Sequence, residues 1–204
     1  MTTILHISSS VRSTGSLSRQ LTNEFVAKLR AAHADSTVIE RDLAAQPVPH
    51  LTEQMMGAYF TPVEQRTPEQ NKIVKLSDDL VAELMAAELV VIGAPMYNFS
   101  ISSTLKAWVD HIARAGMTFQ YGANGPEGLV KGKKFVIFTA RGGVYTEGPA
   151  KVMDFQENYL RAVLGFLGIT DISFVHSEGL AMGEEAVNTA LSGSRSAIEG
   201  LIAA

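Results

Sequence analysis

Residues 89–99 read Leu-Val-Val-Ile-Gly-Ala-Pro-Met-Tyr-Asn-Phe, an apolar run that ends in a proline, two aromatic rings and an amide. The run Leu89–Ala94 is typical of a strand buried on both faces, as in parallel sheets. Ser102–Trp108 comes soon after and is predicted to belong to a helix. The loop Pro95–Phe99 therefore lies where a strand of an α/β sheet ends, which is where such sheets bind ligands.

The rest of the chain alternates strand-like and helix-like segments. Strands are predicted at Thr3–Ile7, Thr37–Arg41, Leu89–Ala94, Lys133–Thr139 and Asp171–Val175, and helices at Leu17–Ala32, Thr67–Ala87, Ser102–Ala115, Ala150–Gly168 and Glu184–Ala203. This alternation predicts an α/β fold with a parallel sheet covered by helices on both faces. Right-handed crossovers favour a doubly wound, flavodoxin-like sheet of five strands in the order 2-1-3-4-5. We expect one domain spanning residues 1–204.

Composition narrows the class of protein. The chain has 204 residues, 46% apolar and 19% charged, with a formal net charge of −4, which argues against nucleic acid as a partner. The absence of cysteine excludes disulfides and thiol catalysis. The five histidines lack ligand spacing, so no metal site is expected. No apolar run approaches the roughly 20 residues of a membrane span, and no signal segment is evident, so a cytoplasmic protein without a membrane partner is expected.

The loop Ser8–Ser18, between the first strand and the first helix, is rich in hydroxyl groups and contains Gly15. Free N–H groups at a helix start, together with the helix dipole, favour a phosphate there. The alternative is a hydrophilic turn with an N-cap serine. The density of hydroxyl groups favours phosphate. Neither a P-loop nor a G-x-G-x-x-G pattern is present, so nucleotide sites of those two kinds are not supported.

The loop Pro95–Phe99 offers two rings and a thioether for stacking. The Asn98 amide and backbone N–H groups could bond the edge of a heteroaromatic ring. The alternative is that Tyr97 and Phe99 are core residues and that Asn98 closes a turn. In isolation the two interpretations carry equal weight.

A third loop, Thr139–Tyr145, follows the fourth predicted strand and contains Gly142 and Gly143. Paired glycines let a backbone approach a ligand closely. Arg141 could counter negative charge on that ligand. The alternative is a glycine-rich turn with a solvated arginine.

Together, the three loops indicate one shared ligand-binding site. In the order 2-1-3-4-5, they all follow strands that are neighbours at the switch point of the sheet. The loop Ser8–Ser18 supplies donors for a phosphate, and Pro95–Phe99 supplies aromatic rings for stacking. The glycines of Thr139–Tyr145 let the backbone approach the ligand closely. FMN, with a phosphate at one end and a flat heteroaromatic ring at the other, is such a ligand.

A histidine and two long connections are the remaining candidates for function. His111 is adjacent to Asp110 and could be taken for half of an acid–base pair, but neighbours on a helix point in different directions, so a helix-surface histidine is favoured. The long connections Gln46–Arg66 and Gly116–Lys133 carry several aromatic residues. Long loops of this kind in a compact domain are more often functional than accidental.

On these residues the chain closely resembles the bacterial FMN-dependent NADH-azoreductase family, which are quinone reductases of flavodoxin-like fold. The resemblance covers essentially the whole chain. It is carried by the serine-rich first loop, Ala94–Phe99, Arg114–Gly116, Asn124–Leu129 and Arg141–Gly143.

The resemblance implies a set of cofactor-binding residues. Those at the FMN phosphate are Ser10, Ser16, Leu17 through its backbone N–H, and Ser18; those along the ribityl chain and ring are Met96, Tyr97, Asn98 and Phe99; those at the pyrimidine side are Ala140, Arg141, Gly142 and Gly143. Leu17, Ala140 and Val163 stand where relatives can have other side chains, which bears on substrate preference.

The resemblance also implies the activity. We expect a homodimer that uses NADH or NADPH to reduce quinones and azo compounds by hydride transfer through bound FMN, with no proton-transferring side chain of its own. Phe60, Phe119 and Tyr121 are candidate substrate walls, placed by the dimer across from the partner's flavin. The alternatives are a flavodoxin-like electron carrier without small-molecule turnover and a phosphate-binding module without redox chemistry.

Overall fold

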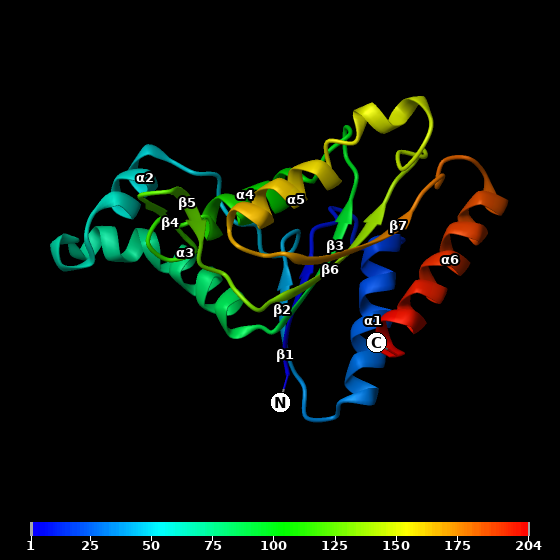
Figure 1. Cartoon of the computed structure of the whole chain (residues 1–204), viewed down its shortest axis with the longest axis horizontal. Coiled ribbons are helices and arrows are strands. Elements are labelled where there is room, and N and C mark those ends of the chain that lie inside the picture. Colours follow the sequence, from blue (N-terminus) through cyan, green and yellow to red (C-terminus); the bar gives the residue numbers. More distant parts are fainter. Residues whose placement is uncertain (1, 204) are drawn as a thin grey trace.

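The computed structural model describes residues 2–203, which form a twisted sheet between two layers of helices (Figure 1). The elements are β1 (Thr3–Ser8), α1 (Leu17–Ala32), β2 (Thr37–Asp42), α2 (Glu53–Phe60), α3 (Pro68–Ala86), β3 (Leu89–Pro95), α4 (Ser103–Ile112), β4 (Phe119–Gly122), β5 (Gly125–Gly128), β6 (Lys134–Ala140), α5 (Glu157–Phe166), β7 (Asp171–Ser177) and α6 (Glu184–Ala203). Short 3-10 turns cover Val63–Gln65 and Pro149–Met153.

The main sheet has the order β2-β1-β3-β6-β7, with every neighbouring pair parallel. With β4 and β5 left out of the count, this is the order 2-1-3-4-5, and the predicted fold class is confirmed. The register pairs Val90 with Leu5 on one side and with Phe135 on the other. Because the strands are parallel, the loops after β1, β3 and β6 lie at the same edge of the sheet.

Alternation along β3 divides the core into two layers. Val90 and Ile92 belong to the cluster that packs under α3, α4 and α5, whereas Val91 belongs to the cluster under α1 and α6. The close approach of α1 to the sheet depends on Gly93, where an added Cβ would lie 3.2 Å from the backbone oxygen of Ser18. That approach brings the start of α1 next to the end of β3.

Two predicted helices are shorter than expected. Instead of one helix over Ala150–Gly168, the chain forms a 3-10 turn, breaks at Asp154 and resumes as α5 at Glu157. The break has a physical cause, because Asp154 Oδ1 accepts from the N–H groups of Gln156 and Glu157 and so caps α5. Similarly, α4 begins at Ser103 and ends at Ile112, since Arg114–Thr118 form turns instead.

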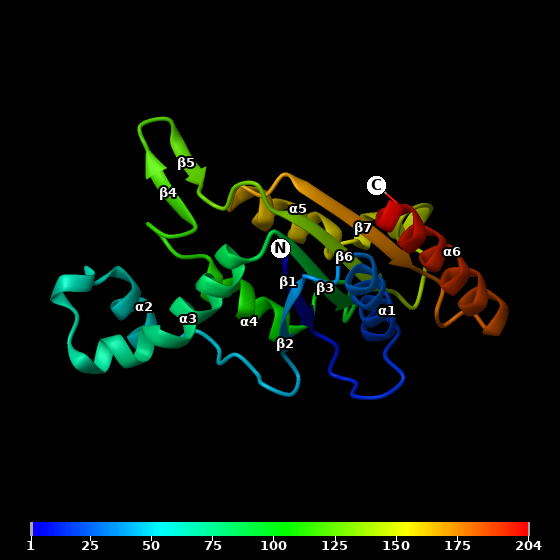
Figure 2. The same ribbon diagram turned by 90° about the horizontal axis from the view of Figure 1, so that it is seen from below.

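The two long connections contain secondary structure that the sequence does not predict. Gln46–Arg66 contains α2, and Gly116–Lys133 contains the antiparallel hairpin β4–β5. Figure 2 shows both at the end of the molecule away from α1 and α6. Among residues 2–203, no helix is long and apolar enough to cross a membrane.

The hairpin joins the rest of the molecule through two glycines. A Cβ on Gly128 would lie 2.1 Å from the backbone nitrogen of Gly168, which itself has a φ of +100°. No side-chain adjustment can relieve this overlap, because the atoms concerned belong to the backbone. The turn between α5 and β7 therefore packs directly on β5.

We predict that Gly128→Ala lowers the free energy of unfolding by about 2 kcal/mol, because the two backbones must separate to admit the methyl group. Urea denaturation at neutral pH measures this change. Gly165→Ala is the control: this glycine lies in α5 with nothing within 4 Å of an added Cβ. The control should be stabilised by roughly 0.5–1 kcal/mol. Equal stability of both variants would contradict the packing described.

Candidate functional site

The loop between β1 and α1 presents unpaired N–H groups. Ser16 caps α1, and its Oγ accepts from the N–H of Arg19 at 3.5 Å. Within residues 2–203, the N–H groups of Leu17 and Ser18 donate to no acceptor. Ser9 fixes the loop, since its N–H and Oγ both donate to the carbonyl oxygen of Gly93, at 3.1 and 2.8 Å. The start of α1 thus presents N–H donors of the kind that bind anions at helix starts.

The loop after β3 is a tight turn between Tyr97 and Ser100. Each of these residues donates its N–H to the other's carbonyl, at 2.9 and 3.1 Å. The central residues, Asn98 and Phe99, have φ values of 49° and 69°. A two-residue turn with positive φ at both centres matches the twist of the flanking chain. Asparagine tolerates this conformation, but phenylalanine does so at a cost, so the turn is strained.

Several polar groups of this turn have no hydrogen-bond partner. Within residues 2–203, the N–H groups of Asn98 and Phe99 donate to no acceptor, and the Asn98 amide makes no side-chain hydrogen bond. The Tyr97 hydroxyl lies 3.4 Å from Ser10 Oγ, which links this turn to the first loop. Phe99 is 43% exposed and Tyr97 is partly exposed. The alternative that these two rings are core residues is wrong.

The loop after β6 uses its carbonyl groups and leaves N–H groups unpaired. The carbonyl of Gly142 accepts from the N–H of Ala181 at 2.9 Å, and that of Gly143 accepts from Gly179 at 3.0 Å. Among the described residues, neither glycine's N–H has an acceptor. The loop after β7 therefore fixes one side of this segment and leaves its donors free.

The first and second loops and the end of β6 surround a cleft of about 300 Å³. Its lining residues are Ser10, Arg12, Gly15, Ser16, Leu17, Pro95, Met96, Tyr97, Ala140, Leu180 and Val187. Tyr97 also borders a second cleft of about 570 Å³, which Asn98 lines together with the start of α4. A ligand with one polar end and one flat apolar end matches this mixture of hydroxyl groups, rings and aliphatic side chains.

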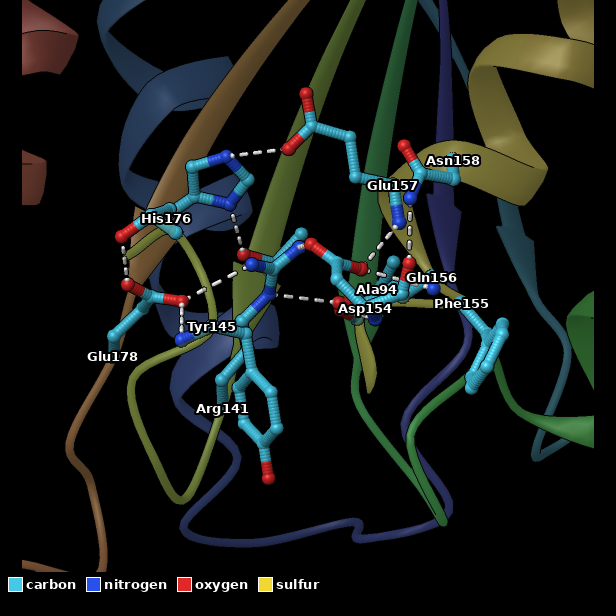
Figure 3. Close-up of polar contacts among 12 residues, drawn as sticks. Ala94, Arg141, Tyr145, Asp154, Phe155, Gln156, Glu157, Asn158, His176 and Glu178 are labelled. Atoms are coloured by element: carbon cyan, nitrogen blue, oxygen red, sulfur yellow. Dashed lines mark hydrogen bonds and ion pairs between the residues drawn. The ribbon is translucent and has the colours of Figure 1, made fainter. Parts of the chain in front are cut away.

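Behind the third loop, Arg141 is fully buried in a network of polar side chains (Figure 3). Its Nη2 pairs with Asp154 Oδ2 and its Nη1 with Glu178 Oε1, both at 3.0 Å, and its Nε donates to Gln156 Oε1 at 3.0 Å. Gln156 in turn donates to the carbonyl of Ala94 at 2.9 Å. One guanidinium thus connects the ends of β3, β6 and β7 with the start of α5.

The ionisation of Glu178 reflects this network. Burial raises the pKa of the Glu178 carboxyl, but hydrogen bonds from Thr146, the Tyr145 N–H and Arg141 outweigh burial and lower it below its ordinary value. The carboxylate is therefore charged at neutral pH and balances Arg141. Burial and the nearby Arg141 charge lower the pKa of His176. His176 Nδ1 lies 2.9 Å from Thr139 Oγ1.

Comparison with known proteins identifies the family. The flavodoxin-like fold family matches residues 2–201. An FMN-dependent NADH:quinone oxidoreductase from Herminiimonas arsenicoxydans is 59% identical over 204 residues, the full length of both chains. The chain belongs to this family. Another member, from Paraburkholderia phymatum, is 56% identical and covers 97% of this chain and 98% of its own.

Solved structures of family members have the same fold. An azoreductase from Bacillus anthracis superposes with a TM-score of 0.90 at 32% identity, covering 98% of each chain. An FMN-dependent NADH-azoreductase from the same species, solved in complex with FMN, superposes with a TM-score of 0.87 at 26% identity, covering 99% of this chain and 100% of its own. The resemblance to the azoreductase and quinone reductase family is confirmed.

The residues of this family member suit FMN. The start of α1 offers two unpaired N–H groups and the Ser16 hydroxyl to a phosphate. The turn after β3 offers a ring surface and an amide, and Gly142 and Gly143 offer unpaired N–H groups to polar atoms of a ring. These donors lie on adjacent loops of one sheet edge. The donor set thus matches an anionic group at one end of a ligand and a flat polar-edged group at the other.

The structure brings most of the predicted cofactor-binding residues to this edge. Ser10, Ser16, Leu17, Met96, Tyr97 and Ala140 line the first cleft, and Asn98 lines the second. Ser18 is buried at the start of α1, with its Oγ 3.3 Å from that of Ser16. Arg141 is the exception, because its side chain is buried among carboxylates. The interpretation of Arg141 as a solvated arginine is wrong. Its charge is paired with two carboxylates, and a role as a countercharge to a ligand stays a prediction.

The predicted helix-surface position of His111 is also wrong. This side chain is fully buried, with Nδ1 3.0 Å from the Tyr59 hydroxyl and Nε2 3.0 Å from the carbonyl oxygen of Pro49. Burial lowers the pKa of His111, which favours the neutral ring. The Arg114 guanidinium covers the Tyr59 ring at 4.0 Å. His111 therefore holds α2 against α4.

The aromatic residues predicted as substrate walls lie apart from the first cleft. Phe60 and Phe119 line a separate cavity of about 210 Å³ that shares no lining residue with the cleft. Tyr121 packs edge-on against Phe119, with ring centroids 5.7 Å apart. Phe60 and Tyr121 are 71% and 75% exposed. These rings belong to α2 and β4, at the end of the molecule away from α1 and α6 (Figure 2).

Sequence reasoning missed Leu180 and Val187, which line the first cleft from the segment after β7 and from α6. No local pattern distinguishes them from ordinary apolar residues. Only the parallel packing of β7 beside β6 brings them to the site. In the part of the chain that the structure describes, no group of three or more His, Cys, Asp or Glu side chains could hold a metal ion.

We predict that Arg141→Met lowers the free energy of unfolding by about 3 kcal/mol, because it leaves two carboxylates near the interior without their partner. Arg161→Met is the matched control, since this arginine is 48% exposed and pairs with Glu157 on the same helix. The control should lower the free energy of unfolding by about 0.5 kcal/mol or less. Urea denaturation compares the two, and an equally small loss in both would show that Arg141 does not support the strand ends.

Proposed function

We propose that this chain binds FMN across the three loops and acts as an NADH:quinone oxidoreductase that also reduces azo compounds. Residues 1–204 would then act as one FMN-binding domain. The observation that carries the proposal is the convergence of unpaired backbone donors on one sheet edge, after β1, β3 and β6. Relatives named FMN-dependent NADH:quinone oxidoreductase, at up to 59% identity over the full chain, support the activity.

The FMN phosphate would bind at the start of α1. The N–H groups of Leu17 and Ser18 and the hydroxyls of Ser10 and Ser16 are the available donors. The positive end of the helix dipole favours the anion further.

The isoalloxazine ring would lie between the turn after β3 and the loop after β6. Met96, Tyr97, Asn98 and Phe99 would contact one side of the cofactor, and Ala140, Gly142 and Gly143 the other, with Arg141 acting from behind the loop. When bound, FMN would supply the hydride chemistry by which two electrons pass from NADH to the acceptor. Donors such as the Gly142 and Gly143 N–H groups would stabilise negative charge on the ring because they are fixed before the reaction begins.

The proposed enzyme is a cytoplasmic homodimer. Phe60, Phe119 and Tyr121 would cover the partner's flavin and form the walls against which nicotinamide, quinone or azo compound stacks. The high exposure of Phe60 and Tyr121 supports this arrangement, because large apolar side chains gathered on one surface are typical of an interface. A site built in this way is completed only by the second copy.

Asn98 provides a test of the ring-binding turn. We predict that Asn98→Gly weakens FMN binding about tenfold, because glycine keeps the positive φ while the amide is lost. Fluorescence titration of the apoprotein with FMN measures the dissociation constant. The control is Asn71→Ala, because this side chain is exposed on α3 and lines neither cleft. It should leave the FMN dissociation constant unchanged. If Asn98→Gly binds FMN with the wild-type dissociation constant, the Asn98 amide does not contact the cofactor.

Steady-state kinetics test the reaction. With NADH and benzoquinone varied together, we expect double-reciprocal plots with parallel lines, because the nicotinamide must leave before the quinone can reach the same ring. NADH alone should bleach the bound flavin without oxygen. A protein that binds FMN but is neither bleached by NADH nor turns over quinone would be an electron carrier, and the enzyme proposal would then be wrong.

A further inference from the structure

Arg12 is a cation at the polar end of the first cleft. Among the described residues that line this cleft, it alone carries a charge. Its side chain is exposed, and its guanidinium makes no hydrogen bond or ion pair with any other residue from 2 to 203. Its backbone N–H, by contrast, donates to Ser10 Oγ at 3.3 Å and so fixes the start of the side chain beside the loop.

The geometry places the Arg12 guanidinium over the start of α1. A Cβ on Gly15 would lie 3.2 Å from Arg12 Nη2, so the side chain folds back along the loop toward the helix. Gly15 directly precedes the N-cap Ser16, and its own φ is +63°. The guanidinium therefore lies close to the residues that leave unpaired N–H groups at the helix start.

A second arginine near this loop, Arg19, already has its charge balanced by a carboxylate. Arg19 pairs with Asp42 through Nη1 at 2.6 Å and through Nη2 at 3.2 Å. Its Nη2 also donates to the carbonyl of Ser10 at 3.2 Å, so that Arg19 braces the loop from behind. Neutral donors and a helix dipole would otherwise face a phosphate that carries close to two negative charges.

We propose that Arg12 is a direct ligand of the FMN phosphate, adding a positive charge to the neutral hydroxyl and N–H donors of the loop Ser8–Ser18. The proposal rests on FMN binding at this cleft. Guanidinium groups bind phosphate through paired N–H donors, and such charge-assisted bonds are stronger than those from hydroxyl groups. Because the side chain is exposed and has no hydrogen bond or ion pair with residues 2–203, it breaks no bond to them when it turns to the phosphate.

FMN and riboflavin distinguish this role from a structural one, because riboflavin lacks the phosphate. We expect Arg12→Ala to weaken FMN binding to the apoprotein about tenfold and to leave riboflavin binding unchanged. Arg12→Lys should recover part of the FMN affinity, because it keeps the charge but loses the paired donors. Fluorescence titration gives all of these dissociation constants without any measurement of turnover.

Salt provides a second readout, which applies even where riboflavin binds weakly. The FMN dissociation constant of the wild type should rise with sodium chloride, and this rise should be smaller in Arg12→Ala, because one charge pair has been removed. Arg30→Ala is the control. It removes the same charge at the other end of α1, about 20 Å away along the helix, and should match the wild type in both readouts.

Each of the following results would overturn the proposal. If Arg12→Ala binds FMN as the wild type does, or shows the wild-type salt dependence, Arg12 does not contact the phosphate. If it loses FMN and riboflavin equally, Arg12 shapes the loop and is not a phosphate ligand. If the Arg12→Ala defect appears only in the KM for NADH, Arg12 contacts a phosphate of NADH and not that of FMN. A wild type that binds no FMN would refute the proposed function as well, whereas the results for Arg12→Ala leave that function intact.

Discussion

The buried Arg141 guanidinium holds the functional edge of this sheet together, because its nitrogens contact both the segment before α5 and the segment after β7. Asp154 precedes α5, Glu178 follows β7, and Gln156 continues the connection to the carbonyl of Ala94 in β3. A charge that is removed from water requires such partners. The network therefore fixes the loops relative to each other before any ligand arrives.

This rigidity explains how the site can leave donors unpaired. The N–H groups at Leu17 and Ser18, at Asn98 and Phe99, and at Gly142 and Gly143 have no acceptor among the described residues. Each unpaired donor costs stability if it is shielded from water, and the positive φ of Phe99 adds strain. These costs concentrate where FMN is proposed to bind, as expected of a site arranged in advance for a ligand.

The fold and the main site were predictable because both depend on local patterns. The apolar run Leu89–Ala94 identifies a central strand, and the five-strand alternation leaves few topologies. The hydroxyl-rich loop and the glycine pair mark two of the three segments proposed to bind FMN without any knowledge of side-chain positions. Their convergence follows from strand order alone.

The errors concern polar side chains whose partners are distant in sequence. The sequence allows a solvated Arg141, but the carboxylates of Asp154 and Glu178 bury it. The sequence places His111 on the surface, but Tyr59 of α2 and Pro49 before it cover this side chain, from a connection without a predicted helix. In both cases tertiary contacts determine the environment of the side chain, and no local spacing encodes those contacts. The break before α5 has the same origin, since Asp154 serves both Arg141 and the helix start.

A crystal structure of the protein with FMN tests the central claim most directly. The account predicts the phosphate at the N–H groups of Leu17 and Ser18, and the ring between the Tyr97–Ser100 turn and the Gly142–Gly143 segment. Arg141 should stay buried among its carboxylates. A flavin bound instead in the cavity between Phe60 and Phe119 of the same protomer, with the donors at the sheet edge left unpaired, would contradict it.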